Sequence, residues 1–247
     1  MASIDLEKKA DLVGAILLDK GVARAPVMRV GVALDISGSM GSLYRGSPSA
    51  VQTAFNQLMG VAVKFDDNGE LDVFKFDDRC EYVGTSKPET GDYDRYIERN
   101  RIATRGGTNY VPIVDEAMNF FFGGSAPKKG IFGGMFGKSD PAPSAGDDTP
   151  VLMLVLTDGE PSDRREIERR LTETTDKAIY WHFVGINGDR SAFPTIAHLA
   201  DALPNVGEVY LPRLDMSDQE IYRQLICDEL IEFVARFTGP VRAGARG

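Results

Sequence analysis

Cysteine and histidine are scarce in this 247-residue chain, with two of each. Cys80 and Cys227 form no Cys-x-x-Cys pair, so the count excludes a disulfide scaffold and a zinc ribbon. A zinc site or a Ser-His-Asp triad built on His182 or His198 stays open in principle, but no Gly-x-Ser-x-Gly elbow supports the triad. His182 lies in the apolar run 179–184, and we expect it to be a hydrogen-bonded strand residue.

Long apolar runs and an excess of positive charge are also missing. The apolar runs fall far short of the roughly 18 residues that span a bilayer, and the N-terminus lacks a basic-then-apolar signal layout. We therefore expect a cytoplasmic protein with no membrane insertion. The net charge of −9 disfavours binding to nucleic acid, which needs clustered Lys and Arg. The basic residues of segment 164–170 alternate with acids, which predicts a solvated helix face.

The most informative motif follows an apolar segment near the N-terminus. The run 27–34 predicts a buried strand, and Asp35-Ile36-Ser37-Gly38-Ser39 comes directly after it. An acid and two hydroxyls thus occupy alternate positions at the end of this strand. Ligands of open α/β sheets bind in the crevice beyond the carboxyl ends of the strands, and hard oxygen ligands suit Mg²⁺.

Two later segments carry similar polar groups. Arg105-Gly106-Gly107-Thr108-Asn109-Tyr110 precedes a predicted helix, and its glycines permit unusual backbone angles and close approach. Residues 151–156 are uninterruptedly apolar, which is typical of a strand buried on both faces, and Thr157-Asp158-Gly159 follows. Taken alone, Thr108 is more typical of a helix cap and Asp158 of a turn.

Together, the three motifs resemble the von Willebrand factor A (vWA) domain and its metal-ion-dependent adhesion site (MIDAS). The resemblance covers roughly residues 27–237. It implies a Rossmann-like α/β fold, with a mostly parallel central sheet and helices on both faces. It also implies Mg²⁺, or alternatively Mn²⁺ or Ca²⁺, with one open position for an Asp or Glu carboxylate of a partner protein. The implied metal ligands are Asp35, Ser37, Ser39, Thr108 and Asp158.

Segments 6–10, 29–40 and 105–110 are similar to bacterial tellurium-resistance (Ter) vWA proteins, which also occur in phage genomes. This resemblance implies a stress-response scaffold. The chain departs from some members, because it lacks a cysteine-rich zinc module and a full calcium-binding stress domain.

The order of patterns predicts one α/β domain in which strands alternate with helices. We expect a helical extension over 1–26 that packs on the domain, a vWA domain over 27–238, and a disordered tail over 239–247. Predicted helices cover 5–19, 49–66, 109–122, 163–176, 191–201 and 217–237. Predicted strands cover 27–34, 70–76, 81–84, 151–156, 178–184 and 206–211.

A glycine- and proline-rich stretch over 123–149 breaks this alternation and predicts a flexible insertion. Its segment 131–136 is apolar. Two interpretations stay open, because these side chains either fold back onto the domain or dock a partner.

The resemblance and these patterns leave three functions open. The first is a non-enzymatic, metal-dependent protein-binding module. The second is a co-chaperone or adaptor of an AAA+ ATPase, which uses the same binding chemistry. The third is a Mg²⁺-dependent phosphatase, which needs a second acid two residues after the first, where this chain has Ser37.

The residues around the predicted ligands also admit several roles. Glu160 is a candidate for holding a metal-bound water, and Asp163 for capping a helix. Asn109 and Tyr110 are candidates for the rim of the site.

Overall fold

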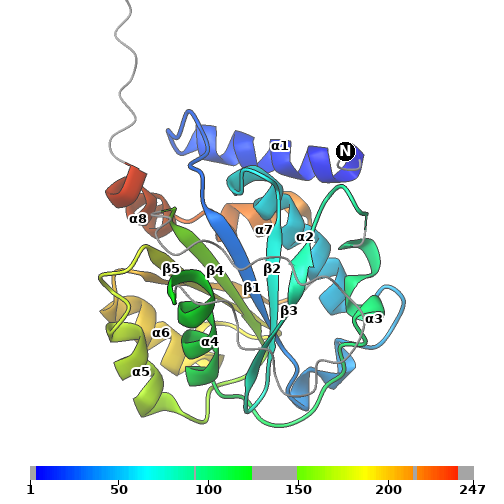
Figure 1. Cartoon of the computed structure of the whole chain (residues 1–247), viewed down its shortest axis with the longest axis vertical. Coiled ribbons are helices and arrows are strands. Elements are labelled where there is room, and N and C mark those ends of the chain that lie inside the picture. The colour runs from blue at the N-terminus through cyan, green and yellow to red at the C-terminus, as the bar shows by residue number, and fades with distance from the viewer. Residues whose placement is uncertain (1–3, 92, 124–148, 214–215, 239–247) are drawn as a thin grey trace, which may run out of the picture.

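Six strands form one sheet in the computed structural model, which describes residues 4–91, 93–123, 149–213 and 216–238. Their order across the sheet is β3-β2-β1-β4-β5-β6 (Figure 1). Neighbouring strands are parallel except β2 and β3, which are antiparallel. The predicted mostly parallel α/β sheet is therefore confirmed. The strands are β1 (Arg29–Asp35), β2 (Leu71–Phe76), β3 (Cys80–Ser86), β4 (Val151–Thr157), β5 (Ile179–Ile186) and β6 (Val206–Leu211).

The central strands are apolar because both of their faces are covered by helices. Every residue of β4 and β5 is buried, as expected for parallel strands enclosed on two sides. Alternate residues divide between two cores: Leu154 belongs to one, and Met153 and Val155 belong to the other.

Helices α1, α2, α7 and α8 supply the first core, and α4, α5 and α6 supply the second (Figure 1). Helix α1 lies against α2 and α7, and its Lys9 Nζ is 2.6 Å from Asp218 Oδ2 of α7. The α-helices are α1 (Ile4–Asp19), α2 (Ala50–Phe65), α3 (Tyr96–Arg99), α4 (Val111–Phe122), α5 (Arg164–Thr172), α6 (Pro194–Ala202), α7 (Asp218–Leu225) and α8 (Asp228–Thr238). Three short 3₁₀ helices are η1 (Ser39–Ser42), η2 (Tyr93–Arg95) and η3 (Arg190–Ala192).

The connection order reverses direction between β1 and β4. From β1 the chain crosses to β2 on one side, and it later returns to β4 on the other side of β1. The carboxyl ends of β1 and β4 therefore lie at a topological switch point, where open α/β sheets bind their ligands.

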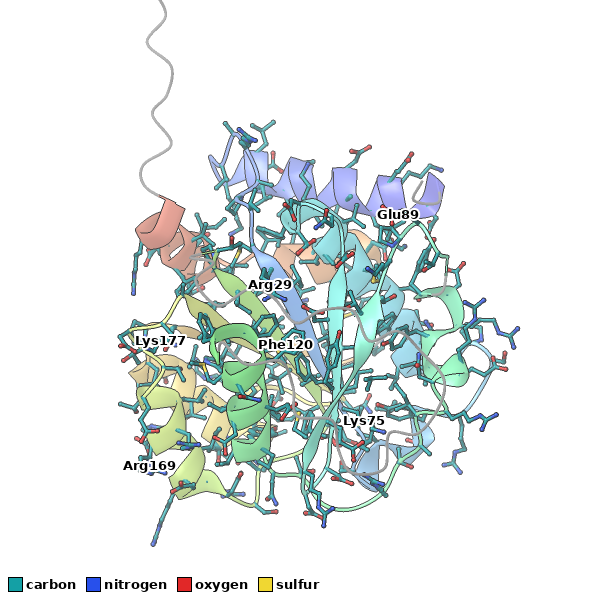
Figure 2. The ribbon with its side chains drawn as sticks, in the orientation of Figure 1. Arg29, Lys75, Glu89, Phe120, Arg169 and Lys177 are labelled. Atoms are coloured by element: carbon teal, nitrogen blue, oxygen red, sulfur yellow. The ribbon has the colours of Figure 1, made fainter. Side chains whose placement is uncertain are left out.

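The opposite end of β1 is held by packing and an ion pair. The guanidinium of Arg29 lies 4.5 Å from the ring centroid of Phe121 and 5.6 Å from that of Phe120, both on α4. Its Nη2 is also 2.9 Å from Asp72 Oδ2 on β2 (Figure 2 labels Arg29 and Phe120). These contacts fix β1 against α4 at the end distant from the predicted metal ligands.

Two predictions about elements need correction. The single helix expected over 217–237 is two helices, because the backbone leaves helical geometry at Ile226, which is buried in the core. His182 is a strand residue, but neither of its ring nitrogens has a hydrogen-bond partner among the described residues. Its face of the sheet also carries Tyr180, which packs on Phe233 of α8 and so leaves an apolar environment.

Some predictions fall outside the described residues: nearly all of the insertion over 123–149, its apolar segment 131–136, and the tail over 239–247. In the part of the chain that the structure describes, no helix is both long and apolar enough to cross a membrane.

Candidate metal centre

The five predicted ligands come from three loops at the carboxyl edge of the sheet. Asp35 is the last residue of β1, and Asp158 follows β4 directly. The parallel register of these neighbouring strands pairs Leu34 with Leu156, so the two chain turns begin side by side.

A continuous chain of hydrogen bonds joins the β1 loop to the β4 loop. Ser37 Oγ and Ser39 Oγ are 3.1 Å apart, and Ser39 Oγ donates to Asp158 Oδ1 over 2.7 Å. The backbone N–H of Ser37 donates to Asp35 Oδ1 over 2.7 Å. Four of the five predicted ligands are thus in one connected group.

Thr108 reaches the same group through backbone contacts. Gly38 N donates to Gly106 O, and Arg105 N donates to Ile36 O, which places the Thr108 loop on the β1 loop. The Thr108 carbonyl accepts from Ser162 N over 2.9 Å. Gly106 has a φ of +69°, so the glycine predicted to supply an unusual backbone angle does so.

Exposure increases across the site from the strand to solvent. Asp35 and Ser37 are buried, Thr108 is nearly so, Asp158 is half-buried and Ser39 is exposed. The group therefore opens toward solvent on the side of Ser39 and Asp158. This arrangement gives an ion or a partner group access from one direction.

Burial raises the pKa of Asp35 to about 6, although hydrogen bonds from Ser37 and Thr157 oppose the shift. The nearby carboxylate of Asp158 raises it further. Neither carboxylate has an ion pair with a Lys or Arg among the described residues. The site is therefore a buried acid beside a second acid, without a protein cation.

This chemistry fits a hard divalent cation. Two carboxylates and three hydroxyls are oxygen ligands of the kind that Mg²⁺, Mn²⁺ and Ca²⁺ accept. No three His, Cys, Asp or Glu side chains in the described parts of the chain gather as a metal-binding group. Any cation held at this edge consequently depends on the serine and threonine hydroxyls as well as on the acids.

Sequence reasoning missed two residues that hold Asp35. Thr157 Oγ1 donates to Asp35 Oδ2 over 2.6 Å, and Tyr44 Oη donates to the Asp35 carbonyl over 2.8 Å. A usable signal existed for Thr157, because it is a hydroxyl at the end of a strand that neighbours β1. No comparable signal marks Tyr44, which lies nine residues away in the loop.

The structure changes two expectations for neighbouring residues and specifies a third. The Glu160 carboxylate accepts from the N–H and hydroxyl of Thr195 at the start of α6, so it is engaged there and not at the site. Tyr110 is buried and does not line the rim of the site. Its hydroxyl donates to Gly159 O over 2.6 Å, in the loop that carries Asp158. Asp163 is a cap, as predicted, but of α4: it accepts from Tyr110 N and Val111 N and makes no side-chain cap bond in α5.

Comparisons with known proteins agree with this fold. An uncharacterized protein of Bacillus subtilis (strain 168), YcbR, is 27% identical over 236 residues, which cover 92% of this chain and 85% of that protein. Among solved structures, proximal thread matrix protein 1 from the mussel byssus superposes with a TM-score of 0.58 at 14% identity. The match covers 84% of this chain and 48% of that one, so this chain spans about half the length of the mussel protein.

A second structure of the mussel protein, described as having a zinc-occupied MIDAS motif, gives a TM-score of 0.53 at 15% identity over 85% of this chain and 50% of that one. At these identities the likeness establishes the fold. The family described as the vWA found in the TerF C-terminus matches residues 27–238, which is most of the chain. With its mostly parallel sheet, its three converging loops and this match, the chain belongs to the vWA family of the TerF C-terminal type.

Proposed function

We propose that this vWA domain is a non-enzymatic binding module that holds a divalent cation and captures an Asp or Glu carboxylate of a partner protein. The cation is Mg²⁺, or alternatively Mn²⁺ or Ca²⁺. The observation that carries the proposal is the pair of acids, Asp35 and Asp158, which lie with three hydroxyls at an open edge and have no protein cation among the described residues. The proposed ligands are Asp35, Ser37, Ser39, Thr108 and Asp158.

Each residue has a distinct part in this proposal. Asp35 provides a buried negative charge whose geometry Ser37 N and Thr157 fix. The hydroxyls of Ser37, Ser39 and Thr108 add oxygen atoms without adding charge. A cation bound to two carboxylates and neutral hydroxyls supplies an electrophilic position for one further carboxylate. The partner would approach over Ser39 and Asp158, where the group opens to solvent.

The arrangement of nearby acids supports a binding role over a phosphatase. An aspartyl phosphatase needs a general acid beside its nucleophile, and Ser37 stands two residues after Asp35. Glu160 is bound at the start of α6 and Asp163 at the start of α4, so both carboxylates are engaged elsewhere. We expect no Mg²⁺-dependent hydrolysis of p-nitrophenyl phosphate, and turnover lost in Asp35→Asn would contradict this assignment.

The biological setting that we propose is a stress-response complex in which this domain is a scaffold. Membership in the TerF-type family and the resemblance to tellurium-resistance vWA proteins support this setting. A role as an adaptor of an AAA+ ATPase uses the same chemistry and differs only in the partner.

Titration calorimetry of Mg²⁺, Mn²⁺ and Ca²⁺ into metal-free protein tests the proposal. We expect saturable one-site binding in the wild type and none in Asp158→Ala, whose side chain is only half-buried. Asp35→Asn is the second variant, because it keeps the shape of the side chain in its buried position. Asp176→Ala, which removes an exposed acid after α5, is the control and should bind like the wild type.

The partner step is tested with a synthetic peptide library that presents single Asp or Glu side chains. We expect binding that requires the cation and disappears both with chelator and in Asp158→Ala. Peptide binding that survives chelation and this substitution would overturn the proposal.

A further inference from the structure

The turn between β2 and β3 packs directly on the loop that carries Thr108. A Cβ atom added at Gly106 would lie 3.0 Å from Asp77 Cβ and 3.0 Å from Asp78 Oδ2. One added at Gly107 would lie 2.9 Å from Asp78 Oδ1. Gly106 therefore serves close approach as well as backbone angle, whereas a side chain at residue 107 would displace the carboxylate of Asp78.

Asp78 binds the loop on both sides of Thr108. Its Oδ2 accepts from Gly107 N over 3.3 Å, and its Oδ1 accepts from Asn109 Nδ2 over 3.4 Å. Both distances are long for hydrogen bonds, but they act on residues that directly flank the predicted ligand. Asp78 thus fixes the loop at two points, one before and one after Thr108.

Asp77 ties the same loop to the sheet and to the β1 loop. Its Oδ2 accepts from Arg105 Nε over 2.7 Å, and its carbonyl accepts from Asn109 N over 3.1 Å. Arg105 N in turn donates to the carbonyl of Ile36 over 2.6 Å. A connected path therefore runs from the β2–β3 turn through the Thr108 loop to the segment between Asp35 and Ser37.

Thr108 depends on this support because its own side chain has none. Within the described ranges, its hydroxyl makes no hydrogen bond, and only its carbonyl is engaged, by Ser162 N. The position of the side chain consequently depends on the backbone on either side. A loop that moved by about an ångström would take one of the five oxygens away from the group.

We infer that Asp77 and Asp78 are positioning residues, which hold the Thr108 hydroxyl in place for a metal through the loop of residues 105–109. Neither touches the proposed ion. This inference rests on the proposed function for the identity of the ligand, but the packing of the turn on the loop stands without it.

Asp78→Ala tests the inference, since Asp78 is more exposed than Asp77 and its loss is less disruptive to folding. Two readouts are taken: the dissociation constant for Mg²⁺ by calorimetry, and hydrogen exchange in peptides covering 104–110 of the metal-free protein. We expect metal affinity to fall roughly tenfold and exchange in the loop to accelerate. Unchanged exchange in this variant would overturn the inference.

Two further variants distinguish the loss of the Asp78 hydrogen bonds from the loss of its negative charge. Asp78→Asn removes the same charge but keeps an acceptor oxygen, so it should retain most of the affinity and the protection of the loop. Asp67→Ala removes one acid from the loop at the opposite end of β2 and should change neither readout. If the Asn and Ala variants lost affinity equally while exchange stayed at the wild-type rate, Asp78 would act through charge alone.

The failure of the proposed function would look different. In that case the wild type itself would bind no Mg²⁺, Mn²⁺ or Ca²⁺. The exchange comparison between wild type, Asp78→Ala and Asp78→Asn would still decide whether Asp78 holds the loop.

Discussion

A single residue, Asp35, shows how the site combines rigidity with free ligand capacity. Its Oδ1 accepts a hydrogen bond from Ser37 N and its Oδ2 accepts one from Thr157 Oγ1. A carboxylate has about four acceptor positions, so these two bonds leave capacity for a cation. The two donors fix the carboxylate before any ion arrives, which reduces the ordering that binding would require.

His182 was expected to be hydrogen-bonded, and the structure places it in an apolar environment instead. It is fully buried on β5, its ring lies 5.6 Å from that of Tyr180, and neither nitrogen has a partner among the described residues. Burial lowers its pKa from 6.5 to about 4, against an opposing influence of Glu229. The folded protein therefore keeps this histidine neutral where the unfolded chain would protonate it.

This difference predicts a loss of stability in mild acid. Between pH 6.5 and about 4 the unfolded chain binds more protons at His182 than the folded one, so the free energy of unfolding falls as the pH falls. The loss is negligible well above pH 6.5 and reaches about 3 kcal/mol by pH 4. Urea unfolding of wild type and His182→Leu at several pH values should show the wild type losing this much relative to the variant.

The other histidine provides the control for that experiment. His198 is exposed, so His198→Gln removes a histidine without changing the packing of the core. Asp66, whose pKa burial raises to about 6, contributes with the opposite sign but cancels in the difference between variants. A His182→Leu curve parallel to the wild type from pH 7 to pH 4 would show that the buried ring does not titrate in this way.

At the scale of elements, the N-terminus of α4 is capped by Asp163, a residue that follows the next strand, β4. The helix begins at Val111 without a side-chain cap of its own, and Asp163 accepts from Tyr110 N over 3.1 Å and from Val111 N over 2.7 Å. A carboxylate at this end also interacts favourably with the helix dipole. The cap joins the start of α4 to the turn before α5, and Thr108 lies only two residues before Tyr110.

Removing this cap should destabilise α4 and leave α5 intact. We expect Asp163→Ala to lower the free energy of unfolding by about 1–2 kcal/mol, because two backbone N–H groups lose their acceptor. Asp163→Asn, which keeps one acceptor oxygen, should lose less. Hydrogen exchange distinguishes the helices: faster exchange at residues 110–112 agrees with the assignment, whereas faster exchange confined to 164–167 would mean that Asp163 caps its own helix.

Elements with a strong local pattern were predictable, and contacts between elements were not. Strand β4 was predictable from its continuous apolar run. The five predicted ligands were chosen from three short motifs, at residues 35–39, 105–110 and 157–159. The break between α7 and α8 was missed because apolar residues continue through Ile226 at helical spacing. The acids Asp228 and Glu229, which suit the first turn of a helix, were the available signal.

Partners such as Asp77 with Arg105, or Asp163 with Val111, could not have been predicted for a different reason. The partners lie 28 and 52 residues apart in sequence, and the order of the strands in the sheet brings them together. Local patterns identify what a residue can do, whereas topology decides which residue it meets.

At the scale of the whole molecule, the proposed metal site is joined to the fold through both cores. The β1 loop leads into α2, which packs on α1, and the Thr108 loop leads into α4 on the opposite face. Unfolding would separate the three loops and so destroy the ligand group. A cation that binds the folded chain alone must therefore stabilise the entire domain.

Thermal unfolding measures this coupling. At a Mg²⁺ concentration 100 times the dissociation constant, one-site binding adds about 2.7 kcal/mol to the free energy of unfolding, which corresponds to a rise in Tm of about 5–10 °C for a chain of this size. Because the net charge is −9, Mg²⁺ also screens repulsion without binding a site, and NaCl of equal ionic strength corrects for that effect. The remaining rise should saturate in the wild type and vanish in Asp158→Ala, while Asp176→Ala keeps it. Equal Mg²⁺-induced shifts in wild type and Asp158→Ala would place the stabilising ion somewhere other than this edge of the sheet.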